Sequence, residues 1–282
     1  MRGNTLKSRR IVNWLINMSV FLLLSGCSGL FFVPDRQLIL EPDRLKLDFE
    51  DIFVRTNDQQ KLHGWLLKGD APVKGTVIFL HGNAQNISYH IASVRWLPKH
   101  GYNVFLYDYQ GYGNSTGKAS IDNSIDNFSS VIETLDRTLP KDQQQYSVFG
   151  QSLGGALAIA AVAKNQSTTS FQSLIVDSAF SGFRTIAKEK MQELLLVRPF
   201  SGALQYLFTS QPNILEEIAS IESTPILILQ GENDKIVPPT HAQNLYARAN
   251  EPKQLHIQAG ARHIQSLASQ TVRALVLEQL SQ

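Results

Sequence analysis

Cysteine is almost absent from this 282-residue chain, which contains only Cys27. No disulfide can therefore join two parts of the chain, so the hydrophobic core must hold the fold by itself. The sequence also lacks clustered Cys and His spacings, an H-E-x-x-H pattern, a P-loop and a G-x-G-x-x-G motif after a strand. We accordingly expect no metal and no nucleotide cofactor.

The sequence also has little excess of charge of either sign. It has 26 basic and 24 acidic residues, a formal net charge of +2. Four of the basic residues precede the first acid, Asp35, so the rest of the chain is slightly acidic. A nucleic-acid-binding domain needs a strongly basic face. We therefore expect no nucleic-acid partner, and no motif indicates an obligate protein partner.

The basic N-terminus is followed by a segment typical of a secretory signal. After Arg10 come the apolar run IVNWLINMSVFLLL and then small residues, SGCSG. The run is shorter than the roughly 20 residues that a spanning helix needs. The alternative is an uncleaved anchor over residues 11–33, since Leu-Phe-Phe-Val at 30–33 extends the apolar stretch.

The residues before the single cysteine, Leu24-Ser25-Gly26-Cys27, resemble a bacterial lipobox. The resemblance implies cleavage of residues 1–26, lipidation of Cys27, and a tether over residues 27–45. It also implies a cell-envelope location, at the outer membrane facing the periplasm, because Ser28 rather than Asp follows. Two or more acyl chains suffice for stable anchoring.

From residue 46 to residue 282, strand-like and helix-like patterns alternate. Segments 47–56 and 61–69 indicate an edge hairpin, and the later apolar runs are typical of strands buried on both faces. The alternation predicts an α/β fold, a mostly parallel sheet with helices on both faces. The expected later strands are 76–81, 103–108, 145–150, 173–177, 225–230 and 254–258, and the expected helices are 84–100, 120–139, 153–164, 240–249 and one ending at 280.

One serine lies at the corner between an expected strand and an expected helix. Gly150-Gln151-Ser152-Leu153-Gly154 is a G-x-S-x-G motif in the strand–turn–helix context that the motif requires. A serine nucleophile needs a base that is oriented by a third group. Asp234 and His263 follow two later strands, in the chain order that suits this arrangement.

Two other residues compete for the acid and base roles. Asp177 also ends an expected strand and is the competing acid, but Asp234 is favoured because its whole loop, GENDKIVP, resembles the acid loop of serine hydrolases. His81 precedes a glycine and is interpreted as a structural histidine bonded to the backbone. The remaining histidines are interpreted as surface or packing residues: His63, His90, His100, His241 and His256.

Four sequence blocks together resemble the α/β-hydrolases, in particular the small-lidded branch with serine-aminopeptidase-like and acyl-esterase-like members. They are FLHGNAQN, LYDYQGYGNSTG, GQSLGG and GENDKIVP, with Gln110 where the family usually has arginine. The resemblance implies that Ser152 is the nucleophile, His263 the base and Asp234 its partner. It also implies an oxyanion hole from the backbone of Leu153 and of the Asn83–Ala84 turn.

Residues 180–218 are expected to form a short helical cap over the site. The stretch 184–200 is interpreted as one amphipathic helix, whose apolar residues either line an acyl site or pack on the sheet. The main hypothesis is a membrane-tethered serine hydrolase that cleaves small-molecule or lipid esters. A serine peptidase or aminopeptidase, a non-catalytic envelope binding protein, and acyl transfer to another acceptor remain as alternatives.

Overall fold

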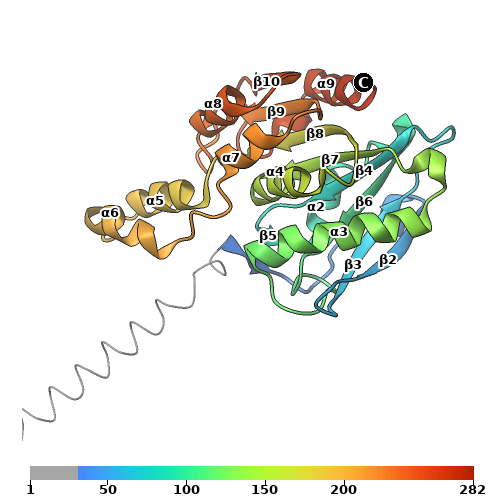
Figure 1. Cartoon of the computed structure of the whole chain (residues 1–282), viewed down its shortest axis with the longest axis horizontal. Coiled ribbons are helices and arrows are strands. Elements are labelled where there is room, and N and C mark those ends of the chain that lie inside the picture. The colour runs from blue at the N-terminus through green and yellow to red at the C-terminus, as the bar shows by residue number, and fades with distance from the viewer. Residues whose placement is uncertain (1–30) are drawn as a thin grey trace, which may run out of the picture.

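The computed structural model describes residues 31–282 and contains one large sheet (Figure 1). Its eight strands run in the order β10-β9-β8-β7-β4-β6-β3-β2. All neighbours are parallel except the pairs β2–β3 and β3–β6. The strands are β2 (Phe49–Arg55), β3 (Lys61–Leu67), β4 (Gly75–Leu80), β6 (Tyr102–Tyr107), β7 (Tyr146–Gln151), β8 (Phe171–Asp177), β9 (Ile226–Gly231) and β10 (Lys253–Gln258). The predicted strands and the edge hairpin are thus confirmed.

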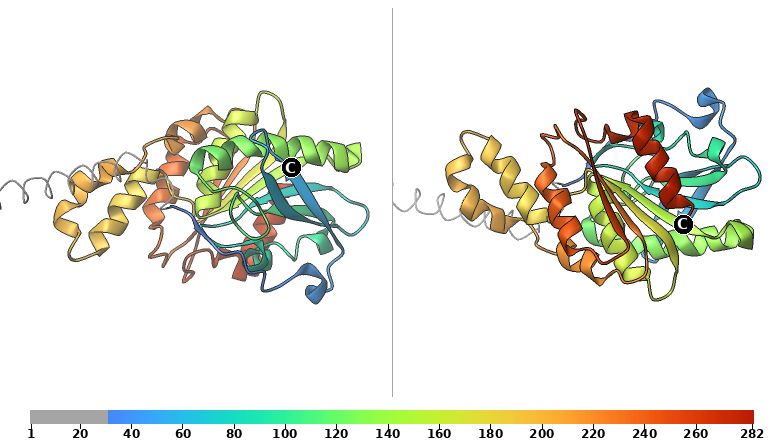
Figure 2. Two further views of the ribbon diagram at one scale, coloured as in Figure 1. Left: turned by 90° about the horizontal axis from the view of Figure 1, so that it is seen from below. Right: turned by 90° about the horizontal axis from the view of Figure 1, so that it is seen from above.

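Helices cover both faces of the sheet, which explains why its central strands have apolar residues on both sides (Figure 2). Strand β4, for example, is buried at all of its residues. One hydrophobic cluster lies between the sheet and α3, α4, α7 and α8, and a second lies under α2 and α9. The bounds are α2 (Ile87–His90), α3 (Ile121–Thr138), α4 (Leu153–Asn165), α7 (Ile214–Ser220), α8 (Pro239–Arg248) and α9 (Gln270–Leu280).

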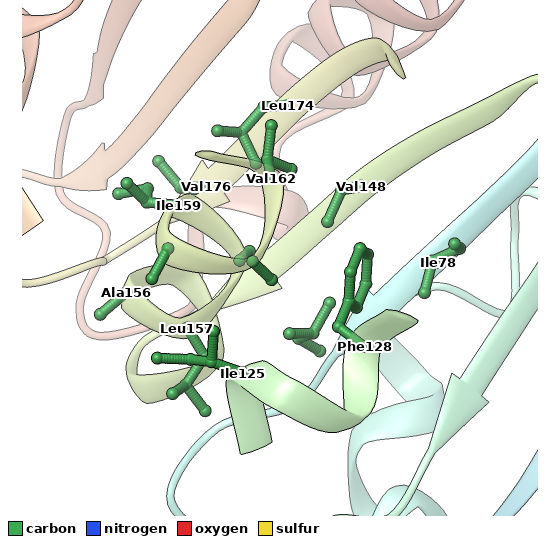
Figure 3. Close-up of a cluster of buried hydrophobic side chains, with 14 of the residues drawn as sticks. Ile78, Ile125, Phe128, Val148, Ala156, Leu157, Ile159, Val162, Leu174 and Val176 are labelled. Atoms are coloured by element: carbon green, nitrogen blue, oxygen red, sulfur yellow. The ribbon is translucent and has the colours of Figure 1, made fainter. Parts of the chain in front are cut away.

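Helix α3 shows how local sequence and packing agree. Ser120 caps its N-terminus, and the Asn123 side chain bonds back to the Ser120 backbone in a capping box. Ile125 and Phe128 lie on the apolar face; Phe128 points toward Val148 of the sheet, and Ile125 points toward Leu157 of α4 (Figure 3). Phe128 is fully buried, a burial that contributes roughly 1.5–3 kcal/mol to folding.

The prediction of one helix over residues 84–100 is wrong. The segment instead contains the two-residue strand β5 (Ala84–Gln85), the single turn α2 and two 3₁₀ turns. The Asn86 side chain caps α2 by accepting a hydrogen bond from Ser88 N, so no helix runs through it. Pro98 opens the last 3₁₀ turn, where its missing N–H excludes a continuous helical ladder.

The expected tether does not run free of the domain over its whole length. Phe32 is buried beside Tyr109 and Tyr112, and strand β1 (Val33–Pro34) pairs with β5. The Asn86 amide also donates hydrogen bonds to the backbone oxygens at positions 35 and 37. Residues 31–45 therefore belong to the folded domain. The expected signal segment and Cys27 lie outside the described residues.

The cap is smaller than residues 180–218. Helix α5 (Phe183–Glu193) and the short α6 (Ser201–Leu204) project beyond the sheet as a helical arm, whereas α7 packs on the body (Figures 1 and 2). The single helix expected to continue to residue 200 ends at Glu193. Leu194 is extended, and Pro199 has no N–H with which to continue an α-helical ladder. Within residues 31–282, none of the helices combines the length and apolarity needed to span a bilayer.

Candidate active site

Ser152 is the single residue in the turn between β7 and α4. Its backbone has φ 54° and ψ −118°, a sparsely populated conformation for a residue with a side chain. The glycine on the helix side is required by space, because a Cβ on Gly154 would lie 2.1 Å from the carbonyl oxygen of Leu80. The amide of Ser152 donates to the backbone oxygen of Asp177 at 2.9 Å, which ties the corner to β8. The turn thereby holds a strained serine above the ends of the strands.

His263 lies against this serine. Its Nε2 is 3.0 Å from Ser152 Oγ, and its Nδ1 is 2.8 Å from Asp234 Oδ2. The three residues come from the turn after β7 and the loops after β9 and β10, so they meet only at the carboxyl edge of the sheet. This geometry allows the histidine to accept the serine proton while the carboxylate holds the other ring nitrogen.

Asp234 is fixed by its own loop. Its Oδ1 accepts hydrogen bonds from the amides of Ile236 at 2.8 Å and Val237 at 2.9 Å, and its Oδ2 accepts one from Gln230 Nε2 at 3.1 Å. Burial alone raises the pKa of Asp234, but the hydrogen bonds from His263 and from the backbone outweigh it and lower the pKa below its usual value. The side chain is therefore an ionised carboxylate next to His263.

Asp177, the competing acid, makes no hydrogen bond to His263. Its carboxylate accepts hydrogen bonds from Gln151 Nε2 and Ser266 Oγ, each at 3.0 Å. Burial raises the pKa of Asp177 to about 6, although these hydrogen bonds oppose the shift. Ser266 lies three residues after His263, so Asp177 braces the histidine loop. The sequence had no signal for Gln151 or Ser266 because their partners are distant in the chain.

His81 has the structural role expected for it. It is buried, and its Nδ1 donates to the carbonyl oxygen of Gly82 at 2.8 Å. Burial lowers the pKa of His81 well below its usual value, so the ring is neutral. Tyr109 donates to the backbone oxygen of His81 at 2.8 Å, which fixes the loop that follows β4.

His241 is buried as a packing residue but also has polar partners that the sequence did not reveal. Its Nδ1 lies 2.8 Å from Ser181 Oγ, and its Nε2 lies 2.9 Å from Glu189 Oε2. The histidine is on α8 and Glu189 is on α5. These contacts therefore hold α5 of the cap against α8 of the main domain.

Gln110 replaces the usual arginine without losing the link to its neighbour. Its Nε2 donates to Asp58 Oδ2 at 2.9 Å, and its Oε1 accepts from Asn123 Nδ2 at 3.0 Å. A hydrogen bond from a neutral amide to the Asp58 carboxylate thus stands where the resemblance implies an ion pair. This position is far in the chain from the catalytic turn and does not contact it.

The expected oxyanion residues are only partly brought together. Asn83 and Leu153 both line the cavity that contains Ser152, and Leu153 is the first residue of α4, whose N-terminus favours negative charge. Ala84 is exposed on β5, paired with Val33, and does not line the cavity. Asn83 rather than Ala84 is therefore the candidate for the second donor.

A cavity of about 510 Å³ opens in front of Ser152. Its walls are mostly apolar, and within residues 31–282 Lys190 is the only charged side chain that lines it. This volume is typical of small-molecule sites. The cap supplies much of the wall, so the apolar cap residues do line a site. The principal apolar residues are Phe31, Phe180, Ile186, Met191, Leu194 and Phe208.

Comparison with known proteins gives a family match and curated relatives. A family model described as "Serine aminopeptidase, S33" (Hydrolase_4) matches residues 71–197 and 184–265. "Uncharacterized protein YfhR" of Escherichia coli (strain K12) is 30% identical over 259 residues, which cover 90% of this chain and 86% of the relative. "Alpha/beta hydrolase domain-containing protein WAV2" of Arabidopsis thaliana is 31% identical over 247 residues, which cover 83% and 79%.

Solved structures share the fold. The Pyrococcus furiosus esterase Pf2001 superposes with a TM-score of 0.72 at 25% identity, covering 89% of this chain and 96% of the esterase. Est1E from Butyrivibrio proteoclasticus, solved with ferulic acid bound, gives a TM-score of 0.63 at 18% identity and covers 82% and 100%. The second likeness is one of fold alone. Both support the eight-stranded α/β-hydrolase architecture described above.

Proposed function

The chain belongs to the α/β-hydrolase family described as serine aminopeptidase, S33, and from this premise we propose that it is a serine hydrolase of carboxylic esters. The observation that carries the proposal is the hydrogen-bonded chain from Ser152 Oγ through His263 to Asp234, at the mouth of an apolar cavity. An activated serine beside an apolar wall suits an acyl group bound through its hydrocarbon part.

The geometry supports an acyl-enzyme mechanism. Ser152 Oγ attacks the ester carbonyl carbon while His263 Nε2 takes its proton, and Asp234 stabilises the resulting imidazolium. The amides of Leu153 and Asn83 stabilise the oxyanion, an effect worth about 2.7–4 kcal/mol for each donor. His263 then protonates the leaving alcohol, and the acyl group stays on Ser152. Water, deprotonated by His263, releases the acid and restores the serine.

The lining of the cavity favours an ester over an aminopeptidase substrate. Recognition of a free amino terminus requires an acidic side chain near the serine, to pair with the ammonium group. Among the described residues that line the cavity there is no Asp or Glu, and the one charged residue, Lys190, is basic. The cavity therefore disfavours a cationic amine, whereas it accommodates a neutral ester or an ester whose leaving group carries a negative charge.

Attachment to a membrane is the second part of the proposal. The basic N-terminus, the apolar run and the lipobox-like residues before Cys27 support a lipid anchor in a bacterial envelope, at the outer membrane facing the periplasm. Phe31 and Phe32 pack on the domain only four and five residues after Cys27. The catalytic domain is thus expected to lie close to the membrane surface.

Covalent labelling tests the mechanism directly. A fluorophosphonate probe added to the full chain in detergent is expected to label Ser152, as mapped by peptide mass spectrometry. The label is expected to disappear in Ser152→Ala and in His263→Ala while both variants keep the wild-type circular dichroism spectrum. Folded wild-type protein that resists labelling would contradict the proposal and favour a binding protein. A panel of acyl esters and aminoacyl amides then compares the two substrate classes.

A further inference from the structure

The projecting cap ends in large apolar side chains that are more than half exposed among residues 31–282. We call this set the apolar tip: Leu194, Leu195, Leu196, Phe200 and Tyr206. Leu195 and Leu196 are 83% and 88% exposed, and Tyr206 is 70% exposed. Single exposed apolar residues are ordinary, but a cluster of large ones on one projecting element indicates an interaction surface.

The apolar tip is continuous with the catalytic cavity. Leu194 belongs to the tip and also lines the cavity in front of Ser152. Ile236, which is 52% exposed, lines the same cavity from the loop of Asp234. An apolar path therefore runs from the outside of the cap to the nucleophile. A partner that covers the tip would also lie over the mouth of the cavity.

The charge of the cap favours an anionic partner. Residues 183–212 contain four basic and two acidic side chains, a net charge of +2. The two acids are engaged: Glu189 lies 2.9 Å from His241 Nε2, and Glu193 pairs with Lys190. Apolar side chains with basic neighbours are the combination that binds the surface of a membrane with anionic lipids.

The start of the described chain lies at the root of the cap. The Phe31 ring packs edge-on against Phe183 with 5.1 Å between ring centroids, and against Phe208 with 5.9 Å. Phe31 also lines the cavity. The four residues from Cys27 to Phe31 can span at most about 14 Å of extended chain. A lipid anchor at Cys27 would therefore hold the membrane surface close to the cap.

We propose that the apolar tip inserts into the same membrane that holds the N-terminus, and that the cavity takes its substrate, a long-chain lipid ester, directly from the bilayer. The proposal rests on the proposed ester hydrolysis and membrane attachment. Leu195 and Leu196 enter the interface, the basic side chains of the cap lie at the headgroups, and Leu194 forms the boundary between lipid and cavity. The acyl chain then reaches Ser152 without crossing water.

Depth-sensitive fluorescence tests the insertion without reference to catalysis. The full chain, in a Trp14→Phe background, is reconstituted into vesicles of phosphatidylethanolamine and phosphatidylglycerol containing brominated lipid. Leu196→Trp is expected to show blue-shifted emission and bromine quenching beyond that of the parent chain. Phe53→Trp, at a half-exposed position on the edge strand β2, is expected to show neither change. Equal, weak quenching of the two tryptophans would overturn the insertion.

Kinetics test the delivery of substrate. The double variant Leu195→Ser with Leu196→Ser is expected to lose at least about ten-fold in kcat/KM on a long-chain ester embedded in vesicles. On a short water-soluble ester the double variant is expected to keep the wild-type kcat/KM. The control Phe53→Ser is expected to keep the wild-type kcat/KM on both esters. Equal losses on both esters would mean a structural role for the leucines and overturn the proposal. Concentration-dependent cross-linking of Leu196→Cys in vesicles, without bromine quenching of Leu196→Trp, would assign the tip to a second copy instead.

The two proposals fail in different ways. A wild-type chain that hydrolyses neither ester would contradict the proposed function, while the quenching of Leu196→Trp would still report on insertion. Wild-type hydrolysis of the soluble ester together with unquenched Leu196→Trp would leave the hydrolase standing and remove the docking surface.

Discussion

Nδ1 of His263 lies 2.8 Å from Oδ2 of Asp234, whereas the carboxylate of Asp177 hydrogen-bonds to Ser266 in the same histidine loop. Asp234 and Asp177 thus support His263 in different ways. The acid after β9 contacts the ring, and the acid after β8 braces the loop that carries it. The acid that follows β9 is therefore the one expected to support catalysis.

Replacing the two acids is expected to separate these roles. Asp234→Asn removes the carboxylate that orients His263, and kcat for an acyl ester is expected to fall by roughly 10³–10⁴-fold. Asp177→Asn keeps one oxygen acceptor and is expected to lower kcat by less than about ten-fold. Steady-state kinetics on a chromogenic ester measure both. The reverse ranking would show that the acid had been wrongly assigned.

Asp177 is also expected to make stability depend on pH. Its pKa is about 6 in the folded chain and about 3.8 in the unfolded chain, because burial disfavours the carboxylate. Between these values the folded state binds more protons, so the free energy of unfolding falls as pH rises. The difference is worth about 3 kcal/mol. In urea unfolding, the free energy of unfolding of Asp177→Asn is expected to rise by about this amount relative to that of the wild type as the pH increases from 4 to 7. Parallel curves for the two proteins would contradict it.

Gly154 is expected to tolerate no side chain. A methyl group there would meet the carbonyl oxygens of Leu80 and His81 at 2.1 and 2.4 Å, so Gly154→Ala is expected to cost about 3 kcal/mol or more and to displace Ser152. Gly202 of α6 is the matched control, since an added methyl group meets no atom within 4 Å. Gly202→Ala is expected to change stability by less than about 1 kcal/mol. Thermal unfolding and fluorophosphonate labelling measure both, and equal effects would refute the steric argument.

Narrowing the cavity is expected to shorten the acyl chain that it accepts. Met191 lines the cavity from α5, so Met191→Trp is expected to lower kcat/KM for a decanoyl ester by about ten-fold or more, while an acetyl ester changes little. Its neighbour Gln192 is exposed and lies outside the cavity lining, so Gln192→Trp is the control. Unchanged chain-length preference in Met191→Trp would place the acyl group elsewhere.

The sequence-based lipidation site gives a prediction for the cell. Cys27→Ser is expected to move the protein from the membrane fraction to the soluble fraction, because no thiol remains to accept lipid. Hydrolysis of a water-soluble ester is expected to be unchanged, since the catalytic residues all lie in the described domain. Immunoblotting of fractionated cells measures the distribution. Retention in the membrane would instead favour residues 11–33 as an uncleaved anchor.

Local sequence alone determined the alternation of strands and helices and the corner at Ser152. Buried strands read as continuous apolar runs, and a serine in a strained turn needs glycines two positions away on both sides; both signals are short-range. The helix expected over residues 84–100 failed for the opposite reason. Asn86, which caps a new helical turn, also bonds to backbone some fifty residues earlier in the chain, which no local pattern reveals.

Only the tertiary structure decided which further residues support Ser152, His263 and Asp234. The hydrogen bond of Ser266 to Asp177 and the contact of His241 with Glu189 of the cap join segments that lie on different elements. The same is true of Phe31, which the sequence assigned to a tether and which packs at the wall of the cavity. Periodicity fixes the conformation of each element because it depends on near neighbours. The site depends on packing between elements. This packing brings the loops after β9 and β10 next to Ser152 at the carboxyl edge of the sheet.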